Sequence, residues 1–185
     1  MRAVAAPLLV GAMLFPGIAL AEGGWDPDIT PLRDGVWNRS LNWSGSAYES
    51  STTNPNSGYV NDIKAQWVVP ALTCVAGAPN ATSSIWVGID GFTTGTTVEQ
   101  IGTQQICTNG VASYSPFYEM YPNPPTSFSL AVKPGDRMSA EVKYIGSGKF
   151  SLSLANLTTG MSYATTQTST TALRQSAEFI VEAQT

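Results

Sequence analysis

The sequence predicts an all-β domain, built either as a sandwich of antiparallel sheets or as a barrel. Apolar and polar residues alternate over many short segments, and turn-forming residues separate these segments at intervals of about 8–12 positions. No stretch beyond the N-terminal apolar run has a 3.6-residue period of helical length. Short strands at this spacing are typical of sandwiches and barrels.

The N-terminal 21 residues are typical of a secretory signal. Arg2 supplies a positive charge, residues 3–20 are almost wholly apolar, and Ala19-Leu20-Ala21 fits the small-x-small cleavage pattern. A transmembrane anchor is the less favoured alternative, because prolines and glycines interrupt a run that is only marginally long enough to span a bilayer. We therefore expect cleavage before Glu22, a secreted protein and no membrane association after cleavage.

The segment that follows, residues 22–40, has no regular period, so we expect an extended arm or a short pro-segment. The chain becomes strand-like from Leu41, and the main domain is expected over residues 41–185. Its first clear strand has alternating apolar positions and ends at Pro70. A loop and a Gly/Thr turn separate the next two strands. The strands expected in this half are 63–69, 84–90 and 98–104.

Turn signals organise the second half of the domain. An aromatic strand ends at a proline-rich turn, and a Pro-Gly turn at 134–135 joins the next two strands. A Gly-Ser-Gly turn at 146–148 leads to a strand in which Phe and Leu alternate with Ser. Another turn at 156–160 allows the following strand to pair back. The strands expected here are 113–121, 128–132, 138–145, 149–156, 162–167 and 176–182.

Composition excludes several classes of function. The chain has no histidine, which rules out Ser-His and Cys-His catalysis and histidine-ligated zinc. We expect no metal and no cofactor. After removal of the leader, eight basic residues face thirteen acidic ones. There is no basic patch for nucleic acid or anionic lipid. Few charges and a pI near 4.6 suit a protein that stays folded in acid.

Two cysteines, Cys74 and Cys107, form an even pair in an exported chain, which favours a disulfide. Two free buried thiols are the alternative.

Several polar residues share strand faces with positions where a ligand has room. Trp86 and Asp90 point the same way with Gly88 between them, because alternate residues of a strand share a face. Gln100 shares its face with Gly102, where the missing side chain allows close approach of a ligand backbone. Each of these signals is weak when taken alone, since a single Glu or Gln on a sheet is usually a solvated surface residue.

Together these segments resemble the eqolisins, the glutamic peptidases secreted by fungi and some prokaryotes. The resemblance extends from residue 42 to residue 183. It rests on seven motifs in order: NWSG at 42–45, AQWVVP at 65–70, WVGIDG at 86–91, EQIG at 99–102, YEMYP at 118–122, NLTTG at 156–160 and AEFIVE at 177–182.

The resemblance implies a lectin- or glucanase-like sandwich of two bent antiparallel sheets with a catalytic dyad on the concave face. The catalytic glutamine falls on Gln100 and the catalytic glutamate on Glu178, and we expect their strands to lie side by side. The substrate-groove residues implied are Trp86, Asp90 and Glu119, with Tyr118 and Tyr121 as wall or support residues. Family members have further strands beyond the AEFIVE segment, so the sheets are expected to be incomplete at the C-terminal side.

The expected activity is hydrolysis of polypeptides at acid pH by a monomeric, pepstatin-insensitive endopeptidase. Glu178 would act on water as general base and then as acid, while the Gln100 amide would donate to the oxyanion. Two other functions stay open. One is a non-catalytic lectin-like domain that stacks glycans on aromatic residues. The other is a glycoside hydrolase with two carboxylates, either Glu119 and Glu178 or Asp90 and Glu178. An amide beside one carboxylate favours acyl transfer over glycoside hydrolysis.

Overall fold

The computed structural model describes residues 40–50, 59–92 and 96–184. All of them belong to one compact unit, Arg39–Thr185. The expected signal (1–21) and all but the last residue of the expected arm (22–40) lie outside the described residues. No helix in the described part of the chain has the length and hydrophobicity needed to cross a membrane.

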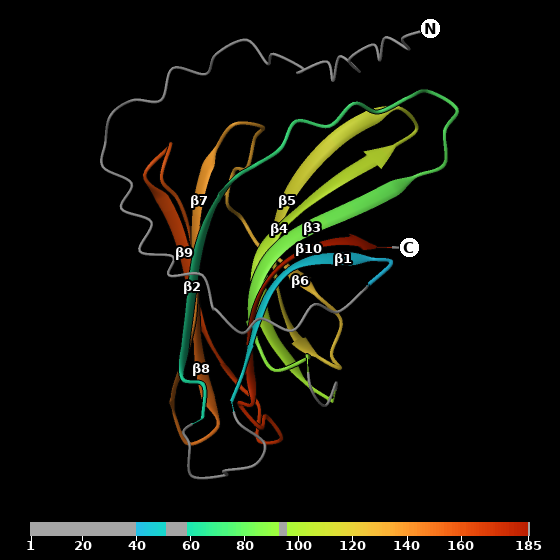
Figure 1. The fold of residues 1–185 in the computed structure, drawn as a ribbon. Helices are drawn as coiled ribbons and strands as arrows, with labels where there is room; N and C mark the ends of the chain where they lie inside the picture. Colours follow the sequence, from blue (N-terminus) through green and yellow to red (C-terminus); the bar gives the residue numbers. More distant parts are fainter. Residues whose placement is uncertain (1–39, 51–58, 93–95, 185) are drawn as a thin grey trace, which may run out of the picture. The chain divides into compact units, whose positions relative to one another are not determined.

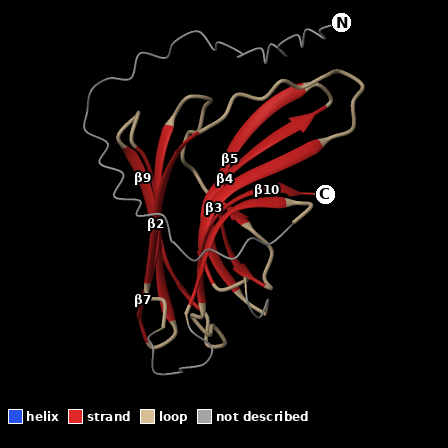
Figure 2. Ribbon diagram, in the orientation of Figure 1, coloured by secondary structure: helices blue, strands red, loops and turns tan. Residues whose placement is uncertain are grey.

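The described residues form two antiparallel sheets and contain no helix (Figures 1 and 2). The six-stranded sheet has the order β1-β10-β3-β4-β5-β6, and the four-stranded sheet the order β2-β7-β8-β9. The strands are β1 (Trp43–Glu49), β2 (Asp62–Val68), β3 (Ala81–Ile89), β4 (Val98–Thr108), β5 (Val111–Tyr121), β6 (Thr126–Ser127), β7 (Arg137–Gly146), β8 (Lys149–Asn156), β9 (Met161–Thr168) and β10 (Ser176–Gln184). The predicted all-β sandwich is confirmed.

The hydrophobic core lies between the two sheets. Alternate residues of β3, β4 and β10 pack against alternate residues of β2, β7 and β8, which is the period-2 pattern that the sequence shows. The central residues of this core are Val87, Ile101, Met138, Val142 and Leu152, all fully buried. The six-stranded sheet bends so that the upper ends of β3, β4 and β5 lean away from the other sheet (Figure 1). Its outward face is therefore concave.

One expected strand is absent. Residues 128–132 lie between β6 and β7 without pairing as a strand. The backbone carbonyl of Ala131 accepts a hydrogen bond from Asn156 Nδ2 at 3.0 Å. The same amide donates to Asp136 Oδ2, and Asn156 Oδ1 accepts from the N–H groups of Thr158 and Thr159. The buried Asn156 side chain thus satisfies one backbone group of this crossover and two of the turn after β8.

The predicted disulfide between Cys74 and Cys107 is confirmed, with 5.5 Å between the two Cα atoms. It connects the loop before β3 to the end of β4.

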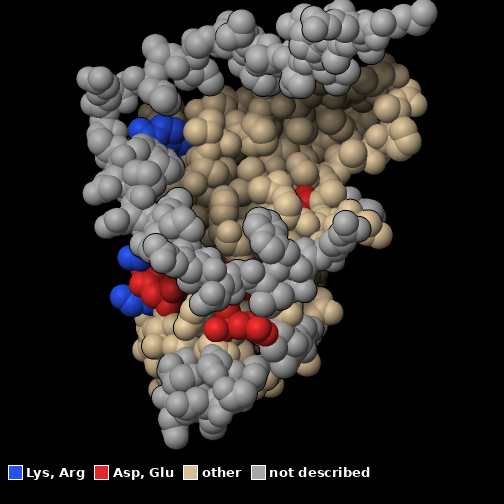
Figure 3. Space-filling model, viewed as in Figure 1, with Lys and Arg blue, Asp and Glu red and all other residues tan. Residues whose placement is uncertain are grey.

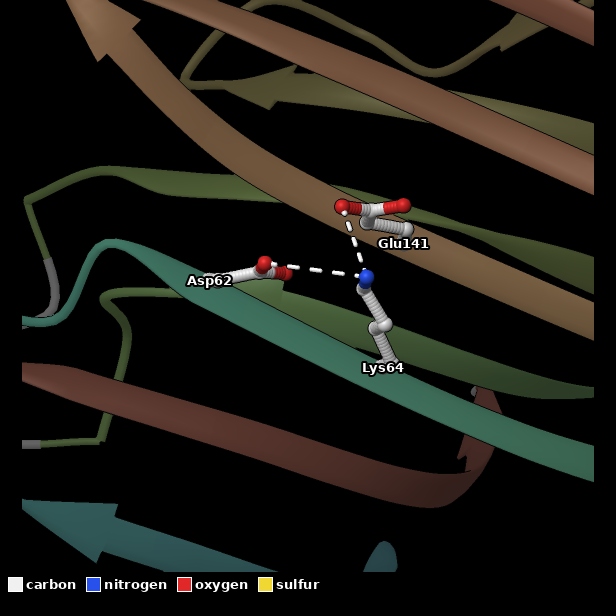
Figure 4. A network of polar contacts seen from close by, with 3 residues as sticks. All are labelled: Asp62, Lys64 and Glu141. Atoms are coloured by element: carbon white, nitrogen blue, oxygen red, sulfur yellow. Dashed lines mark ion pairs between the residues drawn. The ribbon is translucent and has the colours of Figure 1, made fainter.

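Charged residues are few, and most of those in the described part of the chain lie at the surface. The face seen in Figure 3 is largely uncharged, with acidic and basic side chains gathered at a few places. On the outward side of the four-stranded sheet, Lys64 Nζ lies 3.2 Å from Glu141 and 3.8 Å from Asp62 (Figure 4). The Lys64 side chain is 62% exposed, and exposed ion pairs contribute little to stability, so packing holds the sheets together.

Candidate active site

A single cross-strand row brings the polar candidates together. In the antiparallel ladders, Glu178 pairs with Gly88, Gly88 with Gln100, and Gln100 with Glu119. Directly opposite residues point to the same face of a sheet. The neighbouring positions Val87, Ile101 and Ala177 belong to the core between the sheets. The row therefore lies on the outward, concave face of the six-stranded sheet.

The strands of Gln100 and Glu178 are not adjacent, contrary to expectation. β3 lies between them, so their Cα atoms are two strand spacings apart, roughly 10 Å. The intervening residue is Gly88, which has no side chain to fill this interval. A Cβ atom there would lie 3.0 Å from the Trp86 ring and 3.2 Å from Gln100 Cβ. Glycine is therefore needed at this position, because the Trp86 ring and Gln100 already border the place that a side chain would take.

Gln100 is anchored by only one of its polar atoms. Its Nε2 donates to Glu119 Oε2 at 2.6 Å, while its Oε1 is buried without a hydrogen-bond partner among the described residues. The side chain is 8% exposed. The anchoring Glu119 is itself partly buried. Burial raises the pKa of Glu119, the Gln100 N–H opposes this, and the charge of Glu182 adds to it. Glu119 therefore fixes the amide through one N–H, and the carbonyl oxygen of Gln100 stays buried without a partner among the described residues.

Glu178 is a buried carboxyl with few partners. It is 3% exposed, and its Oε1 accepts a hydrogen bond from Ser176 Oγ at 2.7 Å. Burial raises the pKa of Glu178 to about 7; the Ser176 hydroxyl and the Phe92 N–H oppose that rise, and the charge of Asp90 adds to it. On the other side, a Cβ at Gly91 would lie 3.3 Å from Oε2. Gly91 has a φ of 112°, so glycine suits both the turn and the space beside the carboxyl.

Asp90 holds the segment that leads into β10. Its Oδ2 accepts from the backbone N–H groups of Leu173 and Arg174 at 2.8 Å, and its Oδ1 accepts from that of Gln175 at 2.7 Å. The residue is 3% exposed. The family resemblance implies a place for Asp90 in the substrate groove, whereas in the structure its carboxylate is bonded to the backbone of residues 173–175. Because Ser176 directly follows these residues, Asp90 fixes the start of the strand that carries Glu178.

The aromatic candidates separate onto two faces. Trp86 lies on the face of the row, packs with Phe117 and Ile180, and donates from Nε1 to Glu182 Oε2 at 3.1 Å. Gly102, directly opposite, makes room for it: a Cβ there would lie 2.7 Å from Trp86 Cβ. Tyr121 is two residues beyond Glu119 on β5 and is 44% exposed.

Tyr118 does not join the row. It packs against the core on the opposite face, beside the rings of Phe128 and Tyr163, and its hydroxyl accepts from Gln167 Nε2 at 3.4 Å.

Three polar residues that the sequence did not assign to the site are Ser176, Glu182 and Glu99. Alternation along the strand places Glu182 on the face of Glu178, and the same rule was a usable signal for Ser176. The sequence gives no such signal for Glu99, because what sets this residue apart is its burial in the folded protein. It lies on the inward face of β4, fully buried, with neither carboxyl oxygen hydrogen-bonded within the described part of the chain. The described residues hold no cluster of His, Cys, Asp and Glu suited to a metal ion.

Fold and site together define a class of protein: a two-sheet β-sandwich that carries a glutamine and a glutamate in one row on its concave outer face. The family model described as Peptidase A4 family matches residues 41–185, and the chain belongs to that family. The resemblance to the eqolisins is confirmed by this match and by the structural matches, one of which is titled as a member of the eqolisin family.

Two curated relatives show the extent of the similarity. The chain is 31% identical over 145 residues to Scytalidopepsin B of Scytalidium lignicola, covering 76% of this chain and 51% of that protein. It is 37% identical over 81 residues to Aspergillopepsin-2 of Aspergillus niger, covering 43% and 29% respectively. The chain thus spans about half the length of the first relative and less than a third of the second.

Solved structures agree with the sequence matches. The crystal structure of scytalido-glutamic peptidase with a transition state analog inhibitor matches with a TM-score of 0.63 and 30% identity, covering 76% of this chain and 64% of that one. Aspergilloglutamic peptidase from Aspergillus niger matches with a TM-score of 0.51 and 34% identity, covering 55% and 62%.

Proposed function

We propose that this protein is a secreted glutamic endopeptidase that hydrolyses polypeptides at acid pH with Gln100 and Glu178 as its catalytic pair. One observation carries the proposal. A buried amide with spare donor and acceptor capacity and a buried carboxyl occupy the same row, with only Gly88 between them. A monomer and insensitivity to pepstatin belong to the same proposal and rest on family membership.

In this mechanism the ionised Glu178 takes a proton from a water molecule held in the row, and that water attacks the scissile carbonyl. The carboxylic acid formed on Glu178 then protonates the leaving amine. The second N–H of Gln100 donates to the oxygen that becomes negative. Loss of one such donor typically costs about 2.7–4 kcal/mol of transition-state stabilisation. Glu119 contributes by holding the amide in position before the substrate arrives, which lowers the reorganisation cost.

Glu178 has a pKa of about 7, so this mechanism requires that Glu178 be ionised well below its pKa when the enzyme works in acid. In the substrate-free site the ionised fraction of Glu178 falls about tenfold for each pH unit below that value. A base with a high pKa removes a proton from water more readily. Work at pH 3–4 requires that the bound substrate and its water stabilise the carboxylate further. The bound water is the donor available for this purpose, because one N–H of Gln100 is held by Glu119 and the other serves the oxyanion.

The two-carboxylate glycosidase is less well supported by the geometry. Glu119 and Glu178 are three strand spacings apart, roughly 14 Å between Cα atoms, with Gln100 and Gly88 between them. Glycosidases need their carboxyl groups about 5–5.5 Å apart for retention or about 6.5–9.5 Å apart for inversion, whereas the Glu119 carboxyl is bonded to the Gln100 amide that separates it from Glu178.

The deciding experiment is incubation with a denatured protein at about pH 3–4, with pepstatin present. The wild-type chain is expected to cleave, while Glu178→Gln and Gln100→Ala are expected to lose activity and keep their folded spectra. Matched controls are Glu141→Gln and Gln66→Ala on the four-stranded sheet, which are expected to cleave normally. Full activity in both row variants would refute the pair. Binding of glycans without proteolysis would support the lectin-like alternative instead.

A further inference from the structure

The environment of Glu178 contains a hydrogen-bond relay that the proposed mechanism does not use. Ser176 lies two residues before Glu178 on β10, so both side chains point to the concave face. Ser176 is 1% exposed. Its Oγ accepts a hydrogen bond from the Phe92 backbone N–H at 3.3 Å and lies 2.7 Å from Glu178 Oε1. The loop after β3 and the start of β10 thus meet at one hydroxyl.

The direction of the relay follows from the donors present. The Phe92 N–H can only donate, so it occupies a lone pair of the Ser176 oxygen. An ionised carboxylate can only accept, so the hydrogen between Ser176 and Glu178 belongs to the hydroxyl. A donor to the charged form stabilises that form. The relay therefore favours the ionised base and restrains one oxygen of its carboxyl.

The Phe92 N–H also favours the charged form of Glu178, but the nearby side chains do not replace the Ser176 hydroxyl as a donor. Asp90, at the end of β3, is negative and opposes ionisation. Within the row, β1 contributes Ala47 and β3 contributes Gly88, neither of which can donate from a side chain. On β10 itself, Glu182 accepts from Trp86, and across the row Glu119 accepts from Gln100. Among the described side chains, Ser176 is the donor placed to oppose the burial of Glu178.

We infer that Ser176 is a positioning residue for catalysis: its hydroxyl, fixed by the Phe92 N–H, holds Glu178 Oε1 in place and keeps the carboxyl available as a base. This inference rests on the proposed function for its catalytic meaning. Asp90 helps to position Ser176, because its carboxylate accepts hydrogen bonds from the backbone of residues 173–175, which immediately precede Ser176. The Ser176 hydroxyl makes two hydrogen bonds: it accepts one from the Phe92 backbone and donates one to the candidate base.

The test is a direct titration of the Glu178 carboxyl by ¹³C NMR, with the signal assigned by its loss in Glu178→Gln. In Ser176→Ala the titration midpoint of Glu178 is expected to rise by about one pH unit, because one hydrogen bond to the charged form is lost. Ser176→Thr keeps the hydroxyl and is expected to restore the wild-type midpoint. Ser162→Ala, on exposed β9, is the matched control and is expected to leave the midpoint unchanged.

The acid limb of the cleavage profile is expected to move with the NMR midpoint in the same variants. An unchanged Glu178 midpoint in folded Ser176→Ala would overturn the inference, as would a Thr variant that behaves like Ala. Failure of the proposed function gives a different result. The wild-type chain would then cleave no protein at any pH, while the titration would still report whether Ser176 acts on Glu178.

Discussion

Burial of Glu99 makes the stability of the fold depend on pH. Its side chain is 0% exposed, and neither of its oxygens has a hydrogen-bond partner among the described residues. Burial is the largest cause that raises the pKa of Glu99 from 4.5 to about 7, and the charge of Asp90 adds to it. The hydroxyls of Ser169 and Thr97 lower this pKa in part.

The sign of the effect follows from proton binding. Between about pH 4.5 and pH 7 the folded state keeps a proton on Glu99 that the unfolded chain has released. The corresponding stability is complete below pH 4.5 and is lost as the pH rises through about 7. At about 1.36 kcal/mol per pKa unit, the loss is about 3 kcal/mol. Glu178, with a pKa also raised to about 7, contributes in the same direction.

Glu99→Gln removes the titrating group and nearly keeps its shape. The measurement is urea unfolding, followed by tryptophan fluorescence, at pH values from 4 to 8. The wild-type free energy of unfolding is expected to fall over this range, and the fall is expected to be smaller by about 3 kcal/mol in the variant. Burial of the new Gln side chain also has a free-energy cost, but this cost does not change with pH and so does not affect the fall between pH 4 and pH 8. Glu141→Gln serves as the surface control. An equally steep fall in Glu99→Gln and wild type would refute the reasoning.

Four further predictions test the site and the fold. Gly88→Ala is expected to reduce cleavage at least tenfold with normal secondary structure, because its methyl group would lie 3.0 Å from the Trp86 ring and 3.2 Å from Gln100 Cβ and so displace the catalytic amide; unchanged kcat/KM would contradict this. Asp90→Asn is expected to lower the free energy of unfolding in urea by about 2–3 kcal/mol, since a carboxylate that accepts three N–H groups is replaced by a side chain with one acceptor oxygen. A decrease below about 0.5 kcal/mol would show that these three hydrogen bonds are unimportant for stability. In the wild type, kcat is expected to keep its value to lower pH than kcat/KM, because kcat reports Glu178 with substrate bound; coincident acid limbs would argue against stabilisation of the base by substrate. Replacing Cys74 and Cys107 by Ser is expected to lower the free energy of unfolding by about 3–4 kcal/mol for a loop closed over 33 residues, and equal stability of both forms would count against this.

Alternation along the chain predicted much of the site correctly. It placed Gln100 on the face of Gly102, and Trp86 on the face of Gly88, as the structure has them. The same rule separates Tyr118 from Glu119, so the assignment of Tyr118 beside the row went against the pattern. The expected strand at 128–132 failed for another reason. Apolar residues there are buried by a crossover whose backbone bonds to Asn156, and a hydrophobic pattern does not distinguish these two kinds of burial.

The sequence by itself determined the chemistry that is possible here: it has no histidine, it has amides and a few carboxyls on strands, and family motifs single out Gln100 and Glu178 among them. Only the tertiary structure decided which of these groups share an environment. It inserted β3 between the strands of the pair, directed Asp90 to a backbone segment, and buried Glu99 without partners. The physical reason is that side-chain direction is local and follows the strand period. Strand order and burial arise from pairings between segments far apart in the chain, as between β3 and β10.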